Sequence, residues 1–429
     1  MKNISRIKNM DIWYSVAWLI VYRLFLEILY VRIIQPDFFY YGFQLNPSIY
    51  RSILSWMLLF PVLFLAKRWE NLNHISNSIV LILVYLAFIP ATMLFAYMDA
   101  PFLFILTIYY MVLVFLTDRL PSLRLQTYGR LRSGLNIMIY MVLLILGVVE
   151  LFIWARYTNF HIQMDLYNVY GTRLIARSFS MPLVLYYFHS WARIVAPFLA
   201  VYALHNRKVV TFVALLLLQF IVFSIDASKS VFFSLVLGVF LYFLFKKGGS
   251  FTRILPFGLA CLTGGALIEY LLIGTKWMSN YIIRRITMVP ALLNYYFYDF
   301  ANNGGIDYYR QSLSFLGPSL YSKDIADLVG DAYFHAGMHA NNGLFADAYM
   351  NLGIVGVVVM PLMIALMLKI LDGSMRDVSP CVTYTIVIVM SFNFISSSFF
   401  TILLTHGFVI MCLLGYIRQE QKLQLTELL

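Results

Sequence analysis

Long apolar runs recur along the whole chain. Each has about 18 or more residues, enough for a helix to cross a hydrocarbon core of roughly 30 Å. We place the predicted spans at 11–34, 49–66, 76–97, 102–117, 134–154, 183–204, 209–225, 229–245, 254–274, 346–368, 380–397 and 399–417. The pattern predicts an all-α polytopic membrane protein of about twelve transmembrane helices, folded as a single transmembrane domain over residues 1–429.

The basic residues of the connecting loops predict the orientation. With the N-terminus inside, the loops on that side carry 18 of the 31 Lys and Arg residues, and about ten lie outside. This bias is typical of the positive-inside rule, so we expect both termini in the cytoplasm. The first run contains charged residues and no small-residue cleavage site, which favours an uncleaved span over a signal peptide.

Composition agrees with a membrane protein and narrows its chemistry. The chain is 62% hydrophobic and 12% charged, whereas soluble domains average roughly 45–50% apolar and about 25% charged residues. The net charge of +11 is explained by the inner loops and by anionic lipid, so it does not predict a nucleic-acid partner. All three cysteines fall in apolar runs, which predicts neither a disulfide framework nor a cysteine-based metal site.

Three segments are expected on the outer side: residues 155–182, the short hairpin around 226–229, and a long loop over about 275–345. A connection of some 70 residues is far longer than usual, and such loops are more often functional. Within it, "NYYFYDFANNGGIDYYRQ" places aromatic faces beside amide donors, a surface suited to sugars. An aromatic belt at the membrane interface is the alternative for each tyrosine.

Ionisable residues inside the predicted spans are functional candidates, because each costs about 2.5–3.5 kcal/mol to insert. Arg23 and Glu27 are four residues apart and can neutralise each other on one helix face. Arg193 has no acidic neighbour at helical spacing within its own span. We therefore expect it to face other helices or a wet cavity, where it would bind an anion.

Two further groups of charges lie near the outer ends of spans. In "FSIDASKSVFF", Lys229 either pairs with Asp226 or presents its charge, with neighbouring serine hydroxyls, at the level of lipid phosphates. Glu150 and Glu269 also lie near span ends. We expect these two side chains to snorkel to water.

The stretch "HAGMHANNGLFADAYMNLGIVG" (335–356) combines histidines, amides and an aspartate at the start of an apolar run. On a helix, His335, His339 and Asn342 would share one face, and Asp347 and Asn351 would lie four apart. Gly353 and Gly356 would let a neighbouring helix approach closely. Three interpretations stay open: a zinc site of Asp331, His335 and His339, a hydrogen-bond network without chemistry, and a histidine acting as a general base.

The long outer loop, the His–Asn pattern that ends in Gly-x-x-Gly at the next span, and the basic motif "DASKSVFFSLVLGVFL" resemble the O-antigen polymerase and ligase superfamily of bacterial inner membranes. In particular, the chain resembles a Wzy-type oligosaccharide repeat-unit polymerase. The motifs cover only about 40 residues. The resemblance implies a GT-C-like fold with short helices in the long outer loop.

The resemblance also implies an activity. Such enzymes transfer a growing glycan from undecaprenyl pyrophosphate to a hydroxyl of another lipid-linked unit at the periplasmic face. This reaction needs a general base and fixed cations for the pyrophosphate, and strictly requires no metal or other cofactor. Lipid-linked oligosaccharide and bilayer are the implied partners, together with a chain-length regulator.

Residue roles follow from matching the motifs. His339 matches the family's histidine by its place before Asn341 and the two glycines, and His335 is the rival base. Asp347 would orient either a sugar hydroxyl or the histidine. The expected pyrophosphate and substrate ligands are Lys229, which matches the family's basic position, Asn341, and, from the residues alone, Arg193, Arg284, Arg285 and Arg310. Lysine where the family often has arginine offers a point charge instead of a two-pronged fork.

Three alternatives remain. An O-antigen ligase would share nearly every feature and differ in its acceptor, but "HANN" after "AGM" lacks the tighter His-x-His-Asn form. A lipid-phosphate-sugar glycosyltransferase would use Asp37 in the first outer loop, which is short. A polysaccharide flippase or transporter would place its charges in the middle of the membrane.

Overall fold

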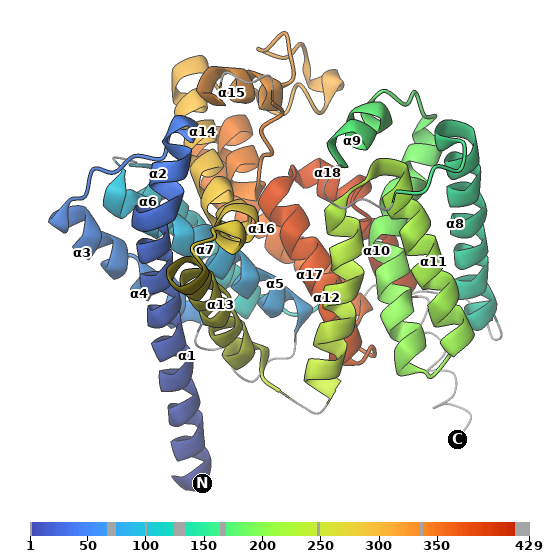
Figure 1. Cartoon of the computed structure of the whole chain (residues 1–429), viewed down its shortest axis with the longest axis horizontal. Helices are drawn as coiled ribbons and strands as arrows, with labels where there is room; N and C mark the ends of the chain where they lie inside the picture. Colours follow the sequence, from blue (N-terminus) through green and yellow to red (C-terminus); the bar gives the residue numbers. More distant parts are fainter. Residues whose placement is uncertain are drawn as a thin grey trace. The chain divides into compact units, whose positions relative to one another are not determined.

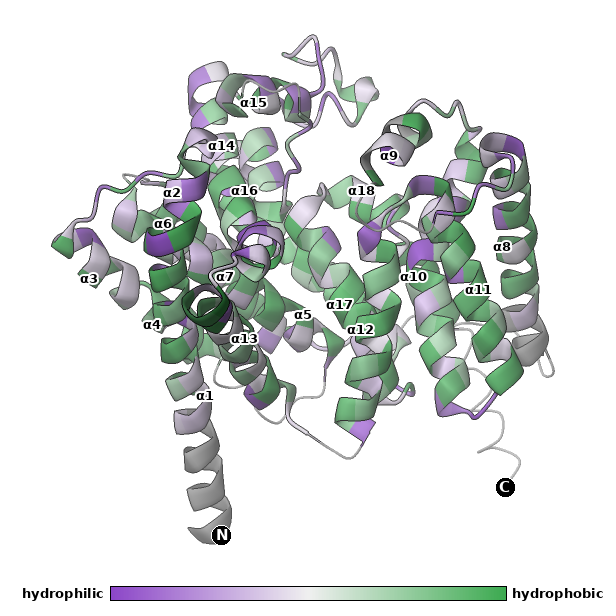
Figure 2. Cartoon of the chain, in the orientation of Figure 1, coloured by the Kyte–Doolittle hydropathy of each residue, from purple (hydrophilic) through white to green (hydrophobic). Residues whose placement is uncertain are grey.

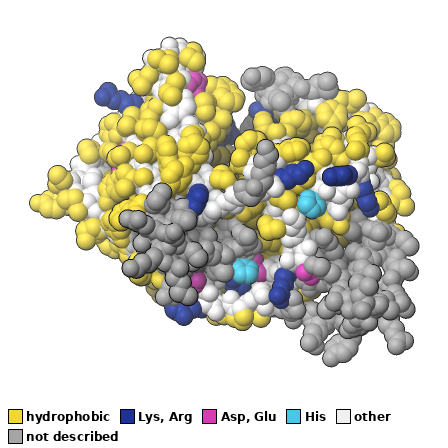
Figure 3. Space-filling model, turned by 90° about the horizontal axis from the view of Figure 1, so that it is seen from below, with side chains coloured by type: hydrophobic (Ala, Val, Ile, Leu, Met, Phe, Trp, Pro, Cys, Tyr) yellow, Lys and Arg dark blue, Asp and Glu magenta, His cyan; other side chains and the backbone are white. Residues whose placement is uncertain are grey.

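We describe a computed structural model of the chain over residues 2–66, 74–98, 101–123, 134–163, 169–246, 249–334 and 338–416. It is all-helical, with 81% helix and no strands in these ranges. Apolar residues cover the helices, and hydrophilic ones gather at helix ends and in the connections (Figure 2). Apolar side chains also cover much of the described surface in Figure 3. This distribution is that of a polytopic membrane protein.

Ten helices of the described residues are long and apolar enough to cross a membrane. They coincide with ten of the twelve predicted spans. The two remaining predictions are also helical: residues 11–34 fall in α1 (Lys2–Leu29) and η1 (Tyr30–Ile34), and 380–397 falls in α17 (Pro380–Ser396). The multi-pass architecture is therefore confirmed, and the count of twelve spans stays a prediction.

The chain divides into two compact units, and α16 and α17 each contribute to both. Unit 1 comprises residues 1–120, 249–367 and 393–399. Its helices are α1, η1, α2 (Gln35–Phe38), η2 (Phe39–Tyr41), α3 (Ile49–Met57), α4 (Leu59–Ala66), α5 (Ile75–Leu83), η4 (Val84–Phe88), α6 (Ile89–Tyr97), α7 (Phe102–Arg119), α13 (Phe251–Ile268), η5 (Glu269–Ile273), η6 (Ser279–Met288), α14 (Val289–Gly304), η7 (Ser314–Leu316), α15 (Ile325–Phe334) and most of α16 (Leu344–Ser374).

Unit 2 comprises residues 121–248, 368–392 and 400–429. Its helices are α8 (Gly134–Thr158), α9 (Val169–Arg177), α10 (Leu183–His205), α11 (Val209–Asp226), α12 (Lys229–Lys246), the end of α16, most of α17, and the helical stretch that follows Phe399, which includes α18 (Phe399–Leu404). Helix α10 packs against α8, α11 and α12. It is the central helix of this unit.

The core of unit 1 is the continuous helix from α5 through η4 to α6, whose residues Ile75 to Ala96 are all buried. Figure 1 shows α14 and α15 at the same end of unit 1 as α2. The predicted long loop over 275–345 is thus mostly helical, because η6, α14 and α15 lie within it. The short helices expected there are present, and α14 is longer than expected.

Three wide π-helical turns in unit 1 have a common cause in the sequence. Segments η1, η4 and η6 each end two residues before a proline: Pro36, Pro90 and Pro290. A proline inside a helix lacks an N–H group, and its ring collides with the carbonyl four residues earlier. A wider turn just before the proline avoids that collision without ending the helix. Segment η6 contacts both η1 and η4, so the widened turns lie together.

Helix α16 is broken one and a half turns after Asp347. Gly353 has φ +55° and ψ −137°, which is not helical, and a side chain there would meet Ile306 at 2.6 Å. The break frees two carbonyl groups, and both accept hydrogen bonds from the predicted outer loop: Asp307 N donates to Met350 O (3.2 Å) and Tyr308 N to Asn351 O (3.1 Å). Gly353 therefore admits a loop, where the sequence suggested a neighbouring helix.

Candidate functional site

His339 lies in the described residues of unit 1 beside α15 and is paired with an aspartate. Its Nδ1 is 2.9 Å from Asp327 Oδ1, and the two side chains are 46% and 52% exposed. When His339 is neutral and donates its Nδ1 proton to Asp327, Nε2 remains as an acceptor. We call this pair the Asp327–His339 dyad.

Two local contacts hold the dyad in place, a backbone hydrogen bond and a close approach at a glycine. Ala340 N donates to Ala326 O (2.9 Å), which ties the segment that carries His339 to the first turn of α15. Gly330 lies where this segment approaches, because a Cβ there would be 1.6 Å from Met338 O. The aspartate is twelve residues from the histidine, a spacing that no helical or strand pattern marks. Sequence analysis therefore missed Asp327.

The helix expected over 335–342 is wrong where the structure describes it. Helix α15 ends at Phe334, and Met338–Gly343 is not helical. His335, the rival base, lies in 335–337, outside the described residues. The predicted three-ligand zinc site of Asp331, His335 and His339 requires a helix through His339, and residues 338–343 do not form one. The described residues instead bring together Asp324, Asp327 and His339, whose ligand atoms lie within 4.8 Å of one another.

Asp347 is 1% exposed and does not contact His339. Its Oδ2 accepts hydrogen bonds from Phe399 N (2.9 Å) and Tyr309 Oη (3.0 Å), and its Oδ1 from Asn351 Nδ2 (3.2 Å) and Asn342 Nδ2 (3.4 Å). This carboxylate joins the predicted outer loop, α16 and the start of α18. Asp327, not Asp347, is the carboxylate that orients the histidine.

Arg284 is the most enclosed of the predicted outer cations, at 6% exposure. Its guanidinium lies 3.8 Å from the ring centre of Phe38 and 5.3 Å from that of Tyr41. Nε donates to Asn280 O (3.3 Å), and no carboxylate pairs with Arg284 in the described part of the chain. Burial, and then the neighbouring charge of Arg285, lower the pKa of Arg284. A stacked, unpaired guanidinium attracts an anion.

The other predicted outer residues of unit 1 are more open. Arg285 and Asn341 are exposed, and Arg310 is half-buried with its guanidinium 5.6 Å from the Tyr308 ring centre. Asp37, proposed for a lipid-phosphate-sugar glycosyltransferase, forms an ion pair with Lys276 (2.8 Å). That ion pair ties α2 to the start of the outer loop.

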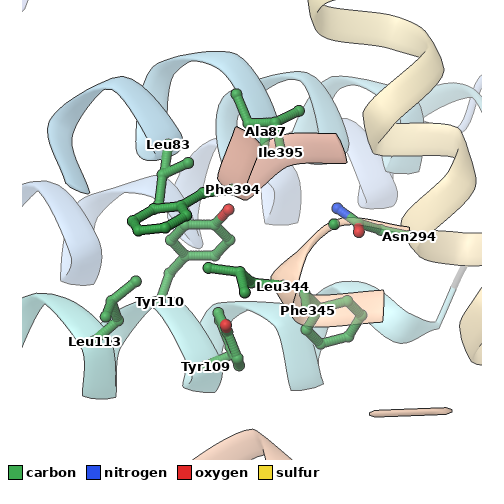
Figure 4. Close-up of a pocket in the computed structure, with 11 residues that line it drawn as sticks. Leu83, Ala87, Tyr109, Tyr110, Leu113, Asn294, Leu344, Phe345, Phe394 and Ile395 are labelled. Carbon is green, nitrogen blue, oxygen red and sulfur yellow. The ribbon is translucent and has the colours of Figure 1, made fainter. Parts of the chain in front are cut away.

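A small cavity of about 10 Å³ lies within unit 1, between α5, η4, α7, α14, the start of α16 and the end of α17. Figure 4 shows Asn294 and Tyr109 among its mostly apolar lining. The Tyr109 hydroxyl is buried and has no hydrogen-bond partner in the described part of the chain. The cavity has room for about one water molecule, so it is not a binding site for a sugar or a lipid.

Arg193 and Lys229 belong to unit 2, whereas the other predicted ligands belong to unit 1. Arg193 Nη2 is 2.5 Å from Asp226 Oδ2, an acidic partner on a different helix. The predicted alternative pair of Asp226 with Lys229 is therefore wrong. Lys229 is half-buried at the start of α12, and within the described ranges its ammonium forms no hydrogen bond or ion pair.

Glu150 also departs from expectation, because it is fully buried instead of snorkelling. Its Oε2 is 2.9 Å from His189 Nδ1, and its Oε1 has no partner among the described residues. Glu269 instead binds the turn that follows η5, where it accepts from Thr275, Trp277 N and Met278 N. The pair Arg23–Glu27 is confirmed as an ion pair within one helix.

Comparison with known proteins adds no relative. No family model matches the chain, and neither a curated protein nor a solved structure is similar to it.

Proposed function

We propose that this protein polymerises lipid-linked oligosaccharide repeat units into a surface polysaccharide at the outer face of a bacterial inner membrane. In this reaction His339 Nε2 takes the proton of the acceptor hydroxyl. The hydroxyl oxygen bonds to the anomeric carbon of the donor glycan, and the bond from that carbon to the phosphate oxygen breaks. Undecaprenyl pyrophosphate leaves with the bonding electrons, and both chain termini lie in the cytoplasm.

The observation that carries the proposal is the exposed Asp327–His339 dyad. A carboxylate on Nδ1 holds the ring in the tautomer whose Nε2 accepts a proton, and stabilises the imidazolium that forms. With both side chains about half exposed, an acceptor hydroxyl can reach Nε2. General-base help of this kind contributes about 10²–10⁴-fold to rate.

Arg284 supports the proposal through charge. The leaving pyrophosphate develops negative charge, which a fixed cation stabilises. The Arg284 guanidinium lies on the ring of Phe38 and has no carboxylate partner in the described ranges. It can therefore bind phosphate without first breaking an ion pair. Arg285, which is exposed, and Arg310, which is half-buried, add positive charge on the predicted outer segments of unit 1. Lys229 is assigned to the same substrate through the resemblance, and Arg193 from its place in the sequence as a cation within a predicted span.

The test is complementation of a strain that lacks its polysaccharide polymerase, read as a ladder on a polysaccharide gel. His339→Ala and Arg284→Ala should abolish the ladder while the protein remains in the membrane. The matched control is His161→Ala, an exposed histidine of unit 2 whose side chain forms no hydrogen bond within the described residues. An intact ladder with His339→Ala removes the base.

A second variant separates the base from a metal ligand. Asp324→Asn keeps the Oδ1 acceptor that caps Ala326 N (2.8 Å) but removes a charged ligand from the Asp324, Asp327 and His339 group. Activity that survives Asp324→Asn but not Asp327→Asn favours the dyad; equal loss, restored by added divalent metal, favours a metal centre. Transfer of single glycans to lipid A core, without laddering, would identify a ligase.

A further inference from the structure

Unit 2 contains a row of four buried or partly buried ionisable side chains, and the proposed reaction uses none of them except Arg193. Along the row, Glu150 of α8 contacts His189 of α10 (2.9 Å), His189 Nε2 faces Asp226 of α11 (3.9 Å), and Asp226 pairs with Arg193 of α10 (2.5 Å). The side chains of Glu150 and His189 are 0% and 4% exposed. Three helices thus meet at one polar row.

We propose that this row is a proton-binding site, with the proton on His189, and that the bound proton docks α8 onto α10 and α11. The proposal does not depend on the transfer reaction above. It follows from the charges of the row and from the shape of α8.

The charges of the row do not balance without a proton. Two carboxylates and one guanidinium leave a net charge of minus one in a buried site. Asp226 is served by Arg193 and by Ser228 N (2.9 Å), so the unbalanced charge is that of Glu150. An unpaired buried charge is strongly unfavourable. A proton on the imidazole between the two carboxylates makes the row neutral, with charges that alternate in sign along it.

The charged groups around His189 come from every helix packed against it. Helix α8 contributes Glu150, α11 contributes Asp226, and α10 itself contributes Arg193. The remaining ones are Lys229 at the start of α12, Arg173 of α9, which donates to Ala227 O, and His406 beyond α18, which interacts electrostatically with Arg193. Lys229 makes no ion pair with Glu150 or Asp226, so His189 is the group that balances Glu150.

The row lies in the centre of the surface by which α8 is attached. Of residues 140–158, only Leu146, Glu150 and Ile153 are buried, and this spacing of four and three places them on one helix face. The remaining residues of this stretch are at least partly exposed, as expected for a helix that faces lipid. The attachment of α8 therefore depends on whether a proton on His189 balances the negative charge of Glu150.

Access to the row is open at one end only. The side chains of Arg193 and Asp226 are 32% and 14% exposed, whereas Glu150 Oε1 is buried and without a hydrogen-bond partner in the described ranges. Protons therefore reach His189 from the Asp226 side. Glu150 is the closed end of the site.

The test is hydrogen exchange of α8 amides in the full-length protein in liposomes. His189→Gln removes the proton carrier and leaves Glu150 unbalanced, so we expect α8 exchange to accelerate on the order of a hundredfold. Glu150→Gln removes the charge that needs balancing and should change exchange little. The double variant Glu150→Gln/His189→Gln should exchange like Glu150→Gln alone, and His161→Gln is the control.

A purely packing role for His189 predicts the opposite pattern, in which the double variant is at least as loose as His189→Gln. That outcome, or unchanged α8 exchange in His189→Gln, would overturn the proposal. Solid-state ¹⁵N spectra of labelled histidine give an independent measurement when His189→Gln does not fold. They should show both ring nitrogens of His189 protonated at about pH 8, above the pKa of roughly 6.5 of an unperturbed imidazole, and a neutral His189 ring would also reject the proposal.

Discussion

Two carboxylate–histidine pairs of equal geometry occur in the two units. In both, a carboxylate oxygen lies 2.9 Å from Nδ1. The Asp327–His339 dyad of unit 1 is about half exposed, whereas Glu150 and His189 of unit 2 are nearly inaccessible. Water can replace either partner of the exposed dyad, so the contact contributes little to stability. The half-exposed ring is free to exchange protons with solvent. No water replaces a partner of the buried pair, so the contact becomes a condition of folding.

The largest expected effect comes from breaking the buried pair. His189→Ala should lower the free energy of unfolding by about 3–5 kcal/mol, because Glu150 is left buried and unpaired. His339→Ala should change it by less than about 1 kcal/mol, as for other exposed pairs. Thermal unfolding of both variants in the same detergent measures the difference, and equal losses would contradict the comparison.

Loss of Asp347, a buried carboxylate in the same unit as the exposed dyad, should rank second. Asp347→Ala should destabilise the protein by about 3 kcal/mol, since several buried donors lose their acceptor and each costs about 1–3 kcal/mol. Asn303→Ala, an exposed amide on α14, is the control for the same unit. If Asp347→Ala unfolds at the wild-type temperature, Asp347 does not join the outer loop to α16 in the way described above.

The third prediction concerns Gly330, where the Met338 carbonyl lies close enough to position the exposed dyad. Gly330→Ala should cost about 1–3 kcal/mol, because the new methyl group displaces the Met338 carbonyl, and His339 should lose its contact with Asp327. Gly171→Ala is a matched control, with no atom within 4 Å of the added Cβ. In Gly330→Ala, both the unfolding temperature and polysaccharide laddering should fall. In Gly171→Ala, both should stay at the wild-type level.

The smallest change in stability should accompany a large change in activity. Asp327→Asn should alter the free energy of unfolding by less than about 1 kcal/mol, yet lower polymer formation on the order of tenfold or more, since the ring loses its orienting charge. Quantified ladders and unfolding curves from the same membranes test this. A parallel fall in both would show that the dyad is structural.

Much of the architecture was accessible from periodicity alone. Ten predicted spans coincide with apolar helices because a run of that length must satisfy its backbone internally in lipid. The Arg23–Glu27 pair was also predictable, since residues four apart on a helix always meet. The π-helical turns before Pro36, Pro90 and Pro290 were not predicted, although the prolines that cause them are visible in the sequence.

The candidate sites were only half predictable. His339 and Arg284 were chosen because of their residue types and positions, but Asp327 and Phe38 were not, because each comes from a separate stretch of chain. His189 could have been noticed four residues before Arg193 on the same helix face. Its proposed role as a proton carrier depends on Glu150 and Asp226, which are 39 and 37 residues away in the sequence.

The sequence by itself determined that this chain crosses a membrane many times. Hydrophobicity is a local property, and the free energy of moving a helix into the bilayer is set residue by residue. Which charges are balanced was decided only by the tertiary structure. A Coulomb interaction depends on distance and on exclusion of water, and both arise when separate helices pack. Glu150 and Asp327 both bear a carboxyl group. The helices around them make Glu150 part of a buried row and Asp327 an exposed partner of His339.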